Sequence, residues 1–135
     1  MTCLLTQHKF ECRVSSVLNK NNRSYGKNYM FDNSPDTCWN SDAGTPQWII
    51  INFEQECEVN SFEIEFQGGF AGKNCHLEIG DKDTEVFELF YPEDTNTLQK
   101  FYLKTPAKAK LFKFVFNEST DFFGRIIIYK LALYS

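Results

Sequence analysis

Short segments in which apolar and polar residues alternate are the feature that most limits the folds open to this chain. Residues 61–66 place Phe62, Ile64 and Phe66 on one face, and residues 75–79 and 112–116 alternate in the same way. A period of two residues is typical of a strand with one buried face. Residues 48–51 and 126–129 are apolar on both faces and too short for a helix. Residues 85–91 and 98–103 add the two remaining strands that we predict.

Residues that favour turns separate these strands. Asn, Asp, Gly and Pro occur at residues 33–36, 43–46, 67–69, 80–81, 92–94 and 105–106. Only residues 28–31 suggest a short helical turn. Many short strands with regular turns predict an all-β fold, a jelly-roll β-sandwich of about seven or eight strands.

The length and charge of the chain narrow the class of protein further. With 135 residues, of which 42% are hydrophobic, we expect a single domain over 1–135, with 1–12 as a frayed N-terminal segment. A net charge of -4 argues against non-specific binding to nucleic acid or to an anionic membrane. A local basic patch is compatible with this net charge. We find no apolar stretch of the length that a secretory signal or a spanning helix needs, so we expect a soluble protein made in the cytosol and not secreted.

Five cysteines lie at positions 3, 12, 38, 57 and 75. Their number is odd, no Cys-x-x-Cys pair occurs, and the last 60 residues contain none. This pattern indicates reduced thiols in a reducing compartment, most of them serving as small core residues.

Catalysis is not expected, because the convergent groups that acid–base or nucleophilic chemistry needs are missing. The chain has two histidines, His8 near the start and His76 on the polar side of its strand. Cys3, His8 and Cys12 are too few and too loosely spaced for a convincing zinc site. We expect no cofactor.

The first half of the chain resembles the discoidin, or coagulation-factor type C, family. The shared motifs are Ser15-Ser16, then Phe-Asp and Thr-x-Trp-x-Ser within residues 31–41, then Gln-Trp-Ile and an apolar strand over 47–53. The resemblance implies the galactose-binding-like fold, which is an antiparallel jelly roll. We expect Trp39 and Trp48 to be large core residues, with a ligand platform as the alternative for each.

Many members of this fold hold a calcium ion at the turn after the Phe-Asp motif. The resemblance implies that Asp32 and Thr37 would supply oxygen ligands, with a Glu from the last strand. Lys130 stands at that last position here, and its ammonium would replace the cation. We therefore predict a metal-free turn closed by Asp32 and Thr37, with calcium as the alternative.

Later segments, at 66–70, 90–94 and 120–125, resemble a group of small proteins that associate with an orphan nuclear receptor. That resemblance implies a protein-binding module that acts as a transcriptional co-repressor, in the nucleus and cytoplasm, and lowers the binding of the receptor to DNA response elements. We expect a monomer without direct contacts to nucleic acid or membrane. A carbohydrate- or phospholipid-binding module is the alternative.

Aromatic residues beside turns are the predicted partner-binding anchors, since loops on a rigid sandwich carry function and aromatic and Arg side chains dominate interface energies. The set is Phe70, Tyr91, Phe122, Phe123 and Arg125.

Two charged segments offer other binding surfaces. The acidic residues Glu54, Glu56 and Glu58 could face a basic receptor domain. The lysine-rich residues 104–110 are predicted to form a solvated turn, with nucleic-acid binding or docking of an acidic partner as the alternatives.

Overall fold

A computed structural model describes residues 3–135 of the chain, with two short α-helices, two 3₁₀ turns and seven strands among them. In chain order the elements are α1 (Leu4–Gln7), β1 (Phe10–Val14), η1 (Leu18–Lys20), α2 (Asn22–Tyr25), η2 (Lys27–Met30), β2 (Trp39–Asn40), β3 (Gln47–Phe66), β4 (Gly72–Gly80), β5 (Thr84–Phe90), β6 (Leu98–Ser119) and β7 (Ile127–Tyr134). Across the described residues, no helix is long and apolar enough to cross a membrane.

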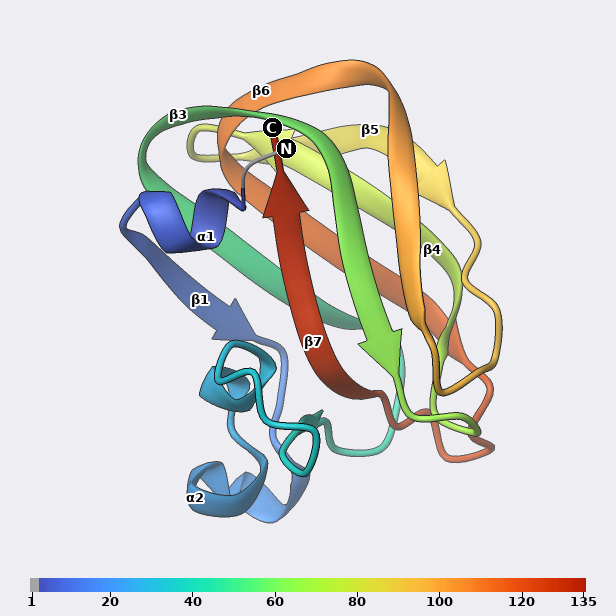
Figure 1. Ribbon diagram of the computed structural model, residues 1–135. Helices are drawn as coiled ribbons and strands as arrows, with labels where there is room; N and C mark the ends of the chain where they lie inside the picture. Colours follow the sequence, from blue (N-terminus) through green and yellow to red (C-terminus); the bar gives the residue numbers. More distant parts are fainter. Residues whose placement is uncertain (1–2) are drawn as a thin grey trace.

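Two long strands, β3 and β6, bend and so contribute to both layers of a sandwich (Figure 1). In the first half of β3, Ile49 lies opposite Val14 of β1 and Phe114 of β6. In its second half, Phe62 lies opposite Leu133 of β7. Every strand pair described is antiparallel, which confirms the predicted jelly-roll β-sandwich.

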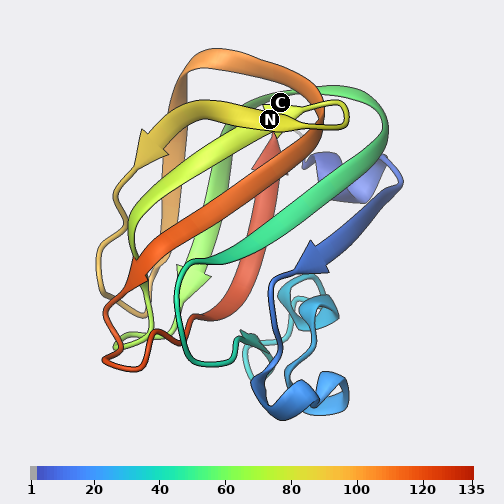
Figure 2. The same cartoon turned by 180° about the vertical axis from the view of Figure 1, so that it is seen from behind.

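The strand order across the structure is β2-β7-β3-β6-β4-β5, with β1 paired to the outer side of β3. Seen from behind, β5, β4, the second half of β6 and the first half of β3 form the near layer (Figure 2). β5 is therefore the edge strand of that layer, and one of its sides has no neighbouring strand among the described residues.

Phenylalanines fill the space between the layers. Phe62 of β3 lies with its ring centroid 5.0 Å from those of Phe90 and Phe114 and 5.1 Å from that of Phe101. Edge-to-face and offset contacts at this spacing add to the free energy gained by burying the rings. The alternating residues of the predicted strands therefore face the core, as their period indicates.

Trp39 and Trp48 differ in their surroundings. Trp39 is 0% exposed, and its indole N–H donates to the Ser16 carbonyl oxygen at 2.9 Å. Trp48 is only half-buried, because Ile49 and Ile51 face the core and leave Trp48 and Ile50 on the outer face of β3. The core prediction is confirmed for Trp39 and wrong for Trp48.

The predicted turn at residues 104–110 is instead part of β6. Ala107 and Ala109 are buried opposite Val59 and Cys57 of β3. Residues 103–106 face no paired residue of β3, so Pro106 removes no ladder hydrogen bond to that strand. Lys104, Lys108 and Lys110 are exposed, on the solvent side of a continuous, bent strand.

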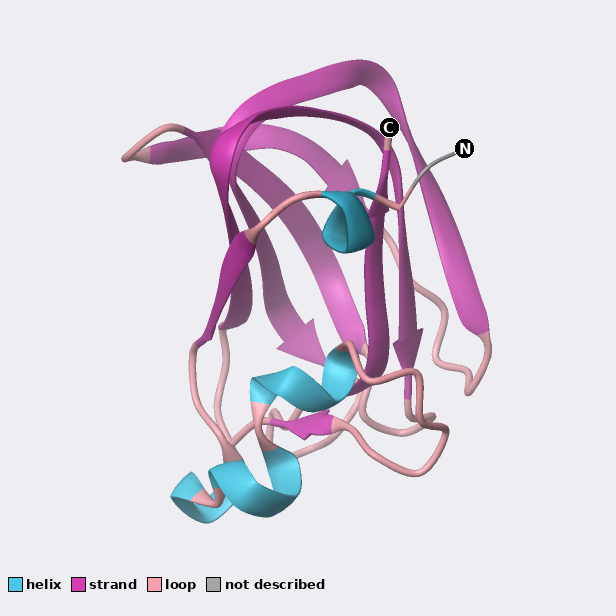
Figure 3. Ribbon diagram, turned by 60° about the vertical axis from the view of Figure 1, so that its left-hand side comes forward, coloured by secondary structure: helices cyan, strands magenta, loops and turns pink. Residues whose placement is uncertain are grey.

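Residues 3–12, which belong to the segment predicted to be frayed, include positions that pack on the sandwich. Residues 1 and 2 lie outside the described part, but Leu4 is 4% exposed and Cys12 is 8% exposed. β1 pairs with β3 over residues 10–14. Figure 3 shows the remaining helical turns, α2 and its 3₁₀ neighbours, gathered at one end of the sandwich. The 3₁₀ turn η2 covers most of the helical turn predicted at 28–31.

Candidate functional site

The connections that follow β3, precede β6 and join β6 to β7 gather at the end of the sandwich opposite the two chain ends (Figure 1). We call this surface the loop end and define it as residues 67–71, 92–97 and 120–126, with the 41–46 connection beside them. The first two connections contain the turns predicted at 67–69 and 92–94, and the third carries three of the predicted anchors, Phe122, Phe123 and Arg125.

Side-chain hydrogen bonds fix the first two connections to each other. The Gly68 N–H donates to the Asn96 side-chain oxygen at 2.6 Å, and the Gly69 N–H donates to an Asp94 carboxylate oxygen at 2.7 Å. Gly69 has a φ of 89°, a conformation that favours glycine. The loop carrying Phe70 is therefore held in a defined shape.

The 120–126 connection is tied to the same loop from the other side. The Ala71 N–H donates to the Thr120 hydroxyl at 3.0 Å, and the Ile127 N–H donates to the Phe70 carbonyl oxygen at 3.1 Å. Loops positioned in this way by a rigid sandwich are the usual carriers of function.

Phe122 and Phe123 project from this framework. Phe122 is 94% exposed and Phe123 is 63% exposed. Their rings meet edge to face with centroids 5.3 Å apart. Because both side chains are largely exposed to solvent, the pair has the character of an interface anchor.

Arg125 packs against Phe70 on the same surface. Its guanidinium carbon lies 5.0 Å from the centroid of the half-buried Phe70 ring, and its Nε donates to the Asp121 carboxylate at 3.1 Å. Burial raises the pKa of Asp121, but hydrogen bonds from Arg125 outweigh this and leave the pKa below its usual value. Arg125 is thus oriented by a carboxylate on one side and an aromatic ring on the other.

Tyr91 belongs to a different feature. It is 64% exposed and lines a cleft of about 380 Å³ between β5 and the first half of β6. Leu89 and Tyr102, which are 56% and 69% exposed, line the same cleft. Four of the five predicted anchors therefore lie on the loop end as two contacting pairs, Phe122 with Phe123 and Arg125 with Phe70. The fifth, Tyr91, lies in an apolar cleft whose other residues the sequence had indicated only as strand.

The Asp32 turn closes on itself. The Asp32 carboxylate accepts the Thr37 hydroxyl at 2.5 Å and the Ser34 N–H at 3.0 Å. These two bonds, that of Thr37 first, hold the pKa of Asp32 below its usual value. Lys130 lines a small pocket beside this turn and lies opposite Glu65 in the β3–β7 ladder.

These residues do not fit a calcium ion. The ion needs six to eight oxygen ligands, whereas Lys130 brings a positive charge to the pocket beside the turn, and the Asp32 carboxylate and Thr37 hydroxyl are bonded to each other. In the part of the chain that the structure describes, no group of three or more His, Cys, Asp or Glu residues is placed to hold a metal ion.

Both histidines make side-chain hydrogen bonds. His8 pairs with Gln55 at 3.1 Å, and His76 lies between Glu78 and Asn117 at 2.7 and 2.9 Å. Within residues 3–135, neither makes a hydrogen bond with a serine or cysteine side chain.

All five cysteines lie within residues 3–135 and are free thiols. Cys12, Cys57 and Cys75 are buried, as predicted for small core residues. Burial raises the pKa of the Cys12 thiol to about 12 and raises that of Cys75 as well.

The fold and its motifs define the class of protein. Residues 12–128 match the F5/8 type C domain, so the chain belongs to the F5/8 type C, or discoidin, family. The match covers both the motifs of the first half and the loop end.

Particular relatives are similar over nearly the whole chain. Nuclear receptor 2C2-associated protein of Danio rerio is 48% identical over 125 residues, which span 91% of this chain and 89% of the relative. The protein of the same name from Homo sapiens is 46% identical over 124 residues, spanning 90% of this chain and 88% of the relative.

Solved structures of low sequence identity share the fold. An F5/8 type C domain from Bacteroides fragilis superposes with a TM-score of 0.84 at 11% identity, covering 99% of this chain and 95% of that one. A family 32 carbohydrate-binding module from Clostridium perfringens, solved with galactose, has a TM-score of 0.78 at 16% identity and covers 93% of both chains.

Proposed function

We propose that this chain is a non-catalytic module that binds an orphan nuclear receptor of the 2C2 type and lowers the occupancy of its DNA response elements. In this role it acts as a transcriptional co-repressor, as a monomer, in the nucleus and cytoplasm. The names of its relatives, at 46–48% identity over most of the chain, support the association with a receptor.

The observation that carries the binding site is the exposed pair of Phe122 and Phe123 on a loop held by hydrogen bonds. A preformed aromatic anchor loses little conformational entropy on binding, so more of its contact energy appears as affinity. Arg125, two residues along the chain from Phe123, adds a cation to the loop end, and its guanidinium N–H groups not bonded to Asp121 can donate to carboxylates of the partner.

Receptor binding and repression are measured separately. A pull-down with purified receptor measures binding, and a gel-shift assay with a labelled response element measures occupancy. We expect the wild-type chain to bind the receptor and to reduce the shifted DNA band. Absence of receptor binding would overturn the proposal, and binding without a loss of the shifted band would overturn the co-repressor role.

Two variants test the site. Phe122→Ser/Phe123→Ser should weaken receptor binding at least about tenfold and leave the melting temperature nearly unchanged, since an interface anchor contributes roughly 2 kcal/mol or more. Phe62→Ala, in the core, should instead cost about 3–5 kcal/mol of folding free energy. If the double variant binds as well as wild type, the loop end is not the receptor site.

The same double variant addresses the alternative function. Galactose and phosphatidylserine vesicles serve as ligands in a binding assay without receptor. Saturable binding of either by the wild type, lost in the double variant, would assign the loop end to a sugar or lipid instead.

A further inference from the structure

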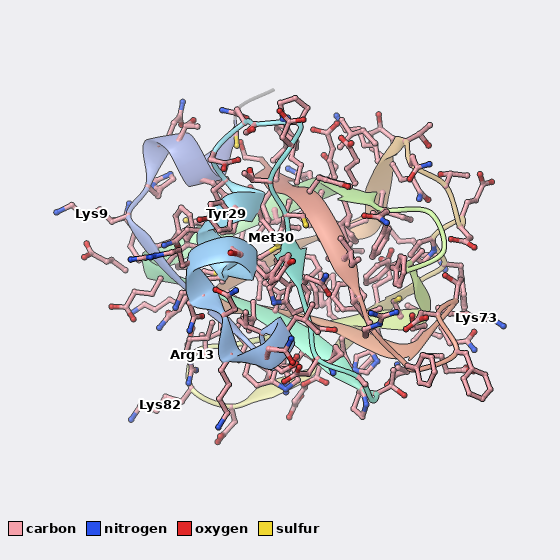
Figure 4. All side chains as sticks on the ribbon, turned by 90° about the horizontal axis from the view of Figure 1, so that it is seen from below. Lys9, Arg13, Tyr29, Met30, Lys73 and Lys82 are labelled. Carbon is pink, nitrogen blue, oxygen red and sulfur yellow. The ribbon has the colours of Figure 1, made fainter. Side chains whose placement is uncertain are left out.

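Positive charge is concentrated in one segment of this acidic chain. Residues 9–27 contain five of the 14 Lys and Arg residues and one of the 18 Asp and Glu residues. Figure 4, a view from below, shows Lys9 and Arg13 projecting on the opposite side of the molecule from Lys73. The chain therefore has a basic side that its net charge of -4 conceals.

Three of these cations line one groove. Arg13 on β1, Lys20 at the end of η1 and Lys27 at the start of η2 border a depression of about 420 Å³. None of the three makes an ion pair with a carboxylate in the described part of the chain, where the ion pairs join other residues. The nearby Asp42 is engaged with the backbone, since one of its carboxylate oxygens accepts the Asn19 N–H at 3.0 Å.

Trp48 supplies an apolar wall to the same groove. It is half-buried on the outer face of β3, and the Lys113 ammonium lies 5.2 Å from the centroid of its ring. A large aromatic surface that the core does not use is thus placed next to three unpaired cations.

The turn that positions Lys20 is strained. Asn19 and Lys20 have φ values of 54° and 56°, in the left-handed region, which asparagine tolerates but which is unfavourable for lysine. The bond from the Asn19 N–H to Asp42 holds this turn. Conformations of this kind persist where the surroundings fix them, and they cluster at binding sites.

We infer that this groove binds a short acidic peptide segment of a protein partner. Carboxylates of the segment meet Arg13, Lys20 and Lys27, and an apolar side chain of the segment packs on Trp48. This inference does not rest on the proposed association with a receptor.

A short peptide fits the charge distribution better than a nucleic acid does. The residues outside 9–27 carry nine cations against 17 anions, which would repel a long polyanion that extends beyond the groove. A segment of a few residues is confined to the basic side, where five cations outnumber the one anion of residues 9–27.

The test uses the whole chain and a capped Glu-Glu-Leu-Glu-Glu peptide. Trp39 is 0% exposed, so quenching of tryptophan fluorescence by acrylamide reports on Trp48. We expect the peptide to protect Trp48 from the quencher in a saturable way. Affinity should fall as salt is raised, because the contacts are between exposed charges.

Matched variants separate the groove from general charge. Arg13→Glu/Lys27→Glu should weaken binding at least about tenfold, whereas Lys73→Glu/Lys104→Glu, with the same change in net charge, should leave it within about twofold. If the first variant does not fold, the neutral variant Arg13→Gln/Lys27→Gln takes its place in the test. We expect it to weaken binding as well.

Any of several results would overturn the inference. They are equal binding of a Gln-Gln-Leu-Gln-Gln peptide, equal loss in the groove and control variants, and tighter binding of a single-stranded oligonucleotide or of phosphatidylserine vesicles than of the acidic peptide. Absence of any saturable protection of Trp48 would overturn it as well.

Discussion

Gly124 is the residue on which the geometry of the loop end depends most directly. Its φ of 82° lies in the left-handed region, and a Cβ atom added there would lie 2.9 Å from the backbone of Gly44. The Gly44 N–H in turn donates to the Phe123 carbonyl oxygen at 2.7 Å. Glycine is therefore needed at 124 both for its backbone conformation and for the close approach of a second loop.

Substitution at two glycines separates these requirements. Gly69 also has a positive φ, of 89°, but a Cβ added there meets nothing within 4 Å. Gly69→Ala should cost about 1 kcal/mol of folding free energy from conformation alone. Gly124→Ala should cost more, about 2 kcal/mol or more, because the contact with Gly44 adds to it.

Urea unfolding of the two variants measures both costs. Equal destabilisation would show that the approach to Gly44 contributes nothing. The Gly124 variant should also weaken receptor binding, since the loop that presents Phe122 and Phe123 must shift.

Among the elements, α1 and β1 show how the N-terminal segment joins the fold. β1 pairs with β3 as an outer strand, and α1 brings Leu4 to a position that is 4% exposed within the core cluster. A backbone bridge between Cys3 and Tyr134 of β7 fixes the start of this segment. α1 therefore stabilises the sandwich although its four residues would not form a helix alone.

Truncation of Leu4 measures that contribution. Leu4→Ala should lower the free energy of unfolding by about 2–3 kcal/mol, within the range for buried leucines. The control is Gln7→Ala in the same helix, where the side chain is exposed and the change should be within about 0.5 kcal/mol. A frayed segment would give two equally small values.

At the scale of the whole molecule, the five thiols report on the integrity of the fold. Cys12, Cys57 and Cys75 are buried between the layers, whereas Cys3 and Cys38 are half-buried. Because burial raises the pKa of Cys12 to about 12, its reactive thiolate form is scarce at neutral pH in the folded state.

Alkylation followed by mass spectrometry tests this arrangement. Under denaturing, non-reducing conditions we expect five labelled thiols. In the native protein near pH 8, Cys12 and Cys75 should react far more slowly than Cys3, and at rates that rise with global unfolding. Two thiols protected from labelling in denaturant would indicate a disulfide and contradict the prediction.

Much of the fold could be predicted because alternation is a local property. A period of two residues fixes which side chains share a face, and so Phe62, Ile64 and Phe66 could be assigned to the core from their spacing alone. The aromatic turns could be assigned to loops for the same reason, since Gly, Asp and Pro act on their own backbone.

The residues at which the strands end could not be predicted from the local sequence. β3 and β6 each continue through segments that contain turn-forming residues, because the partner strand bends with them and residues 103–106 face no paired position. Whether Pro106 ends a strand or lies within one depends on the strand beside it.

The sequence by itself determined the sandwich, its aromatic core and the presence of exposed loops with bulky aromatic residues. Only the tertiary structure decided that Trp48 lies outside the core, that Tyr91 is separate from Phe122, and that Arg13, Lys20 and Lys27 share a groove. The physical reason is that a repeat in the chain tells which residues point the same way. What covers that face is decided by segments far away in the sequence.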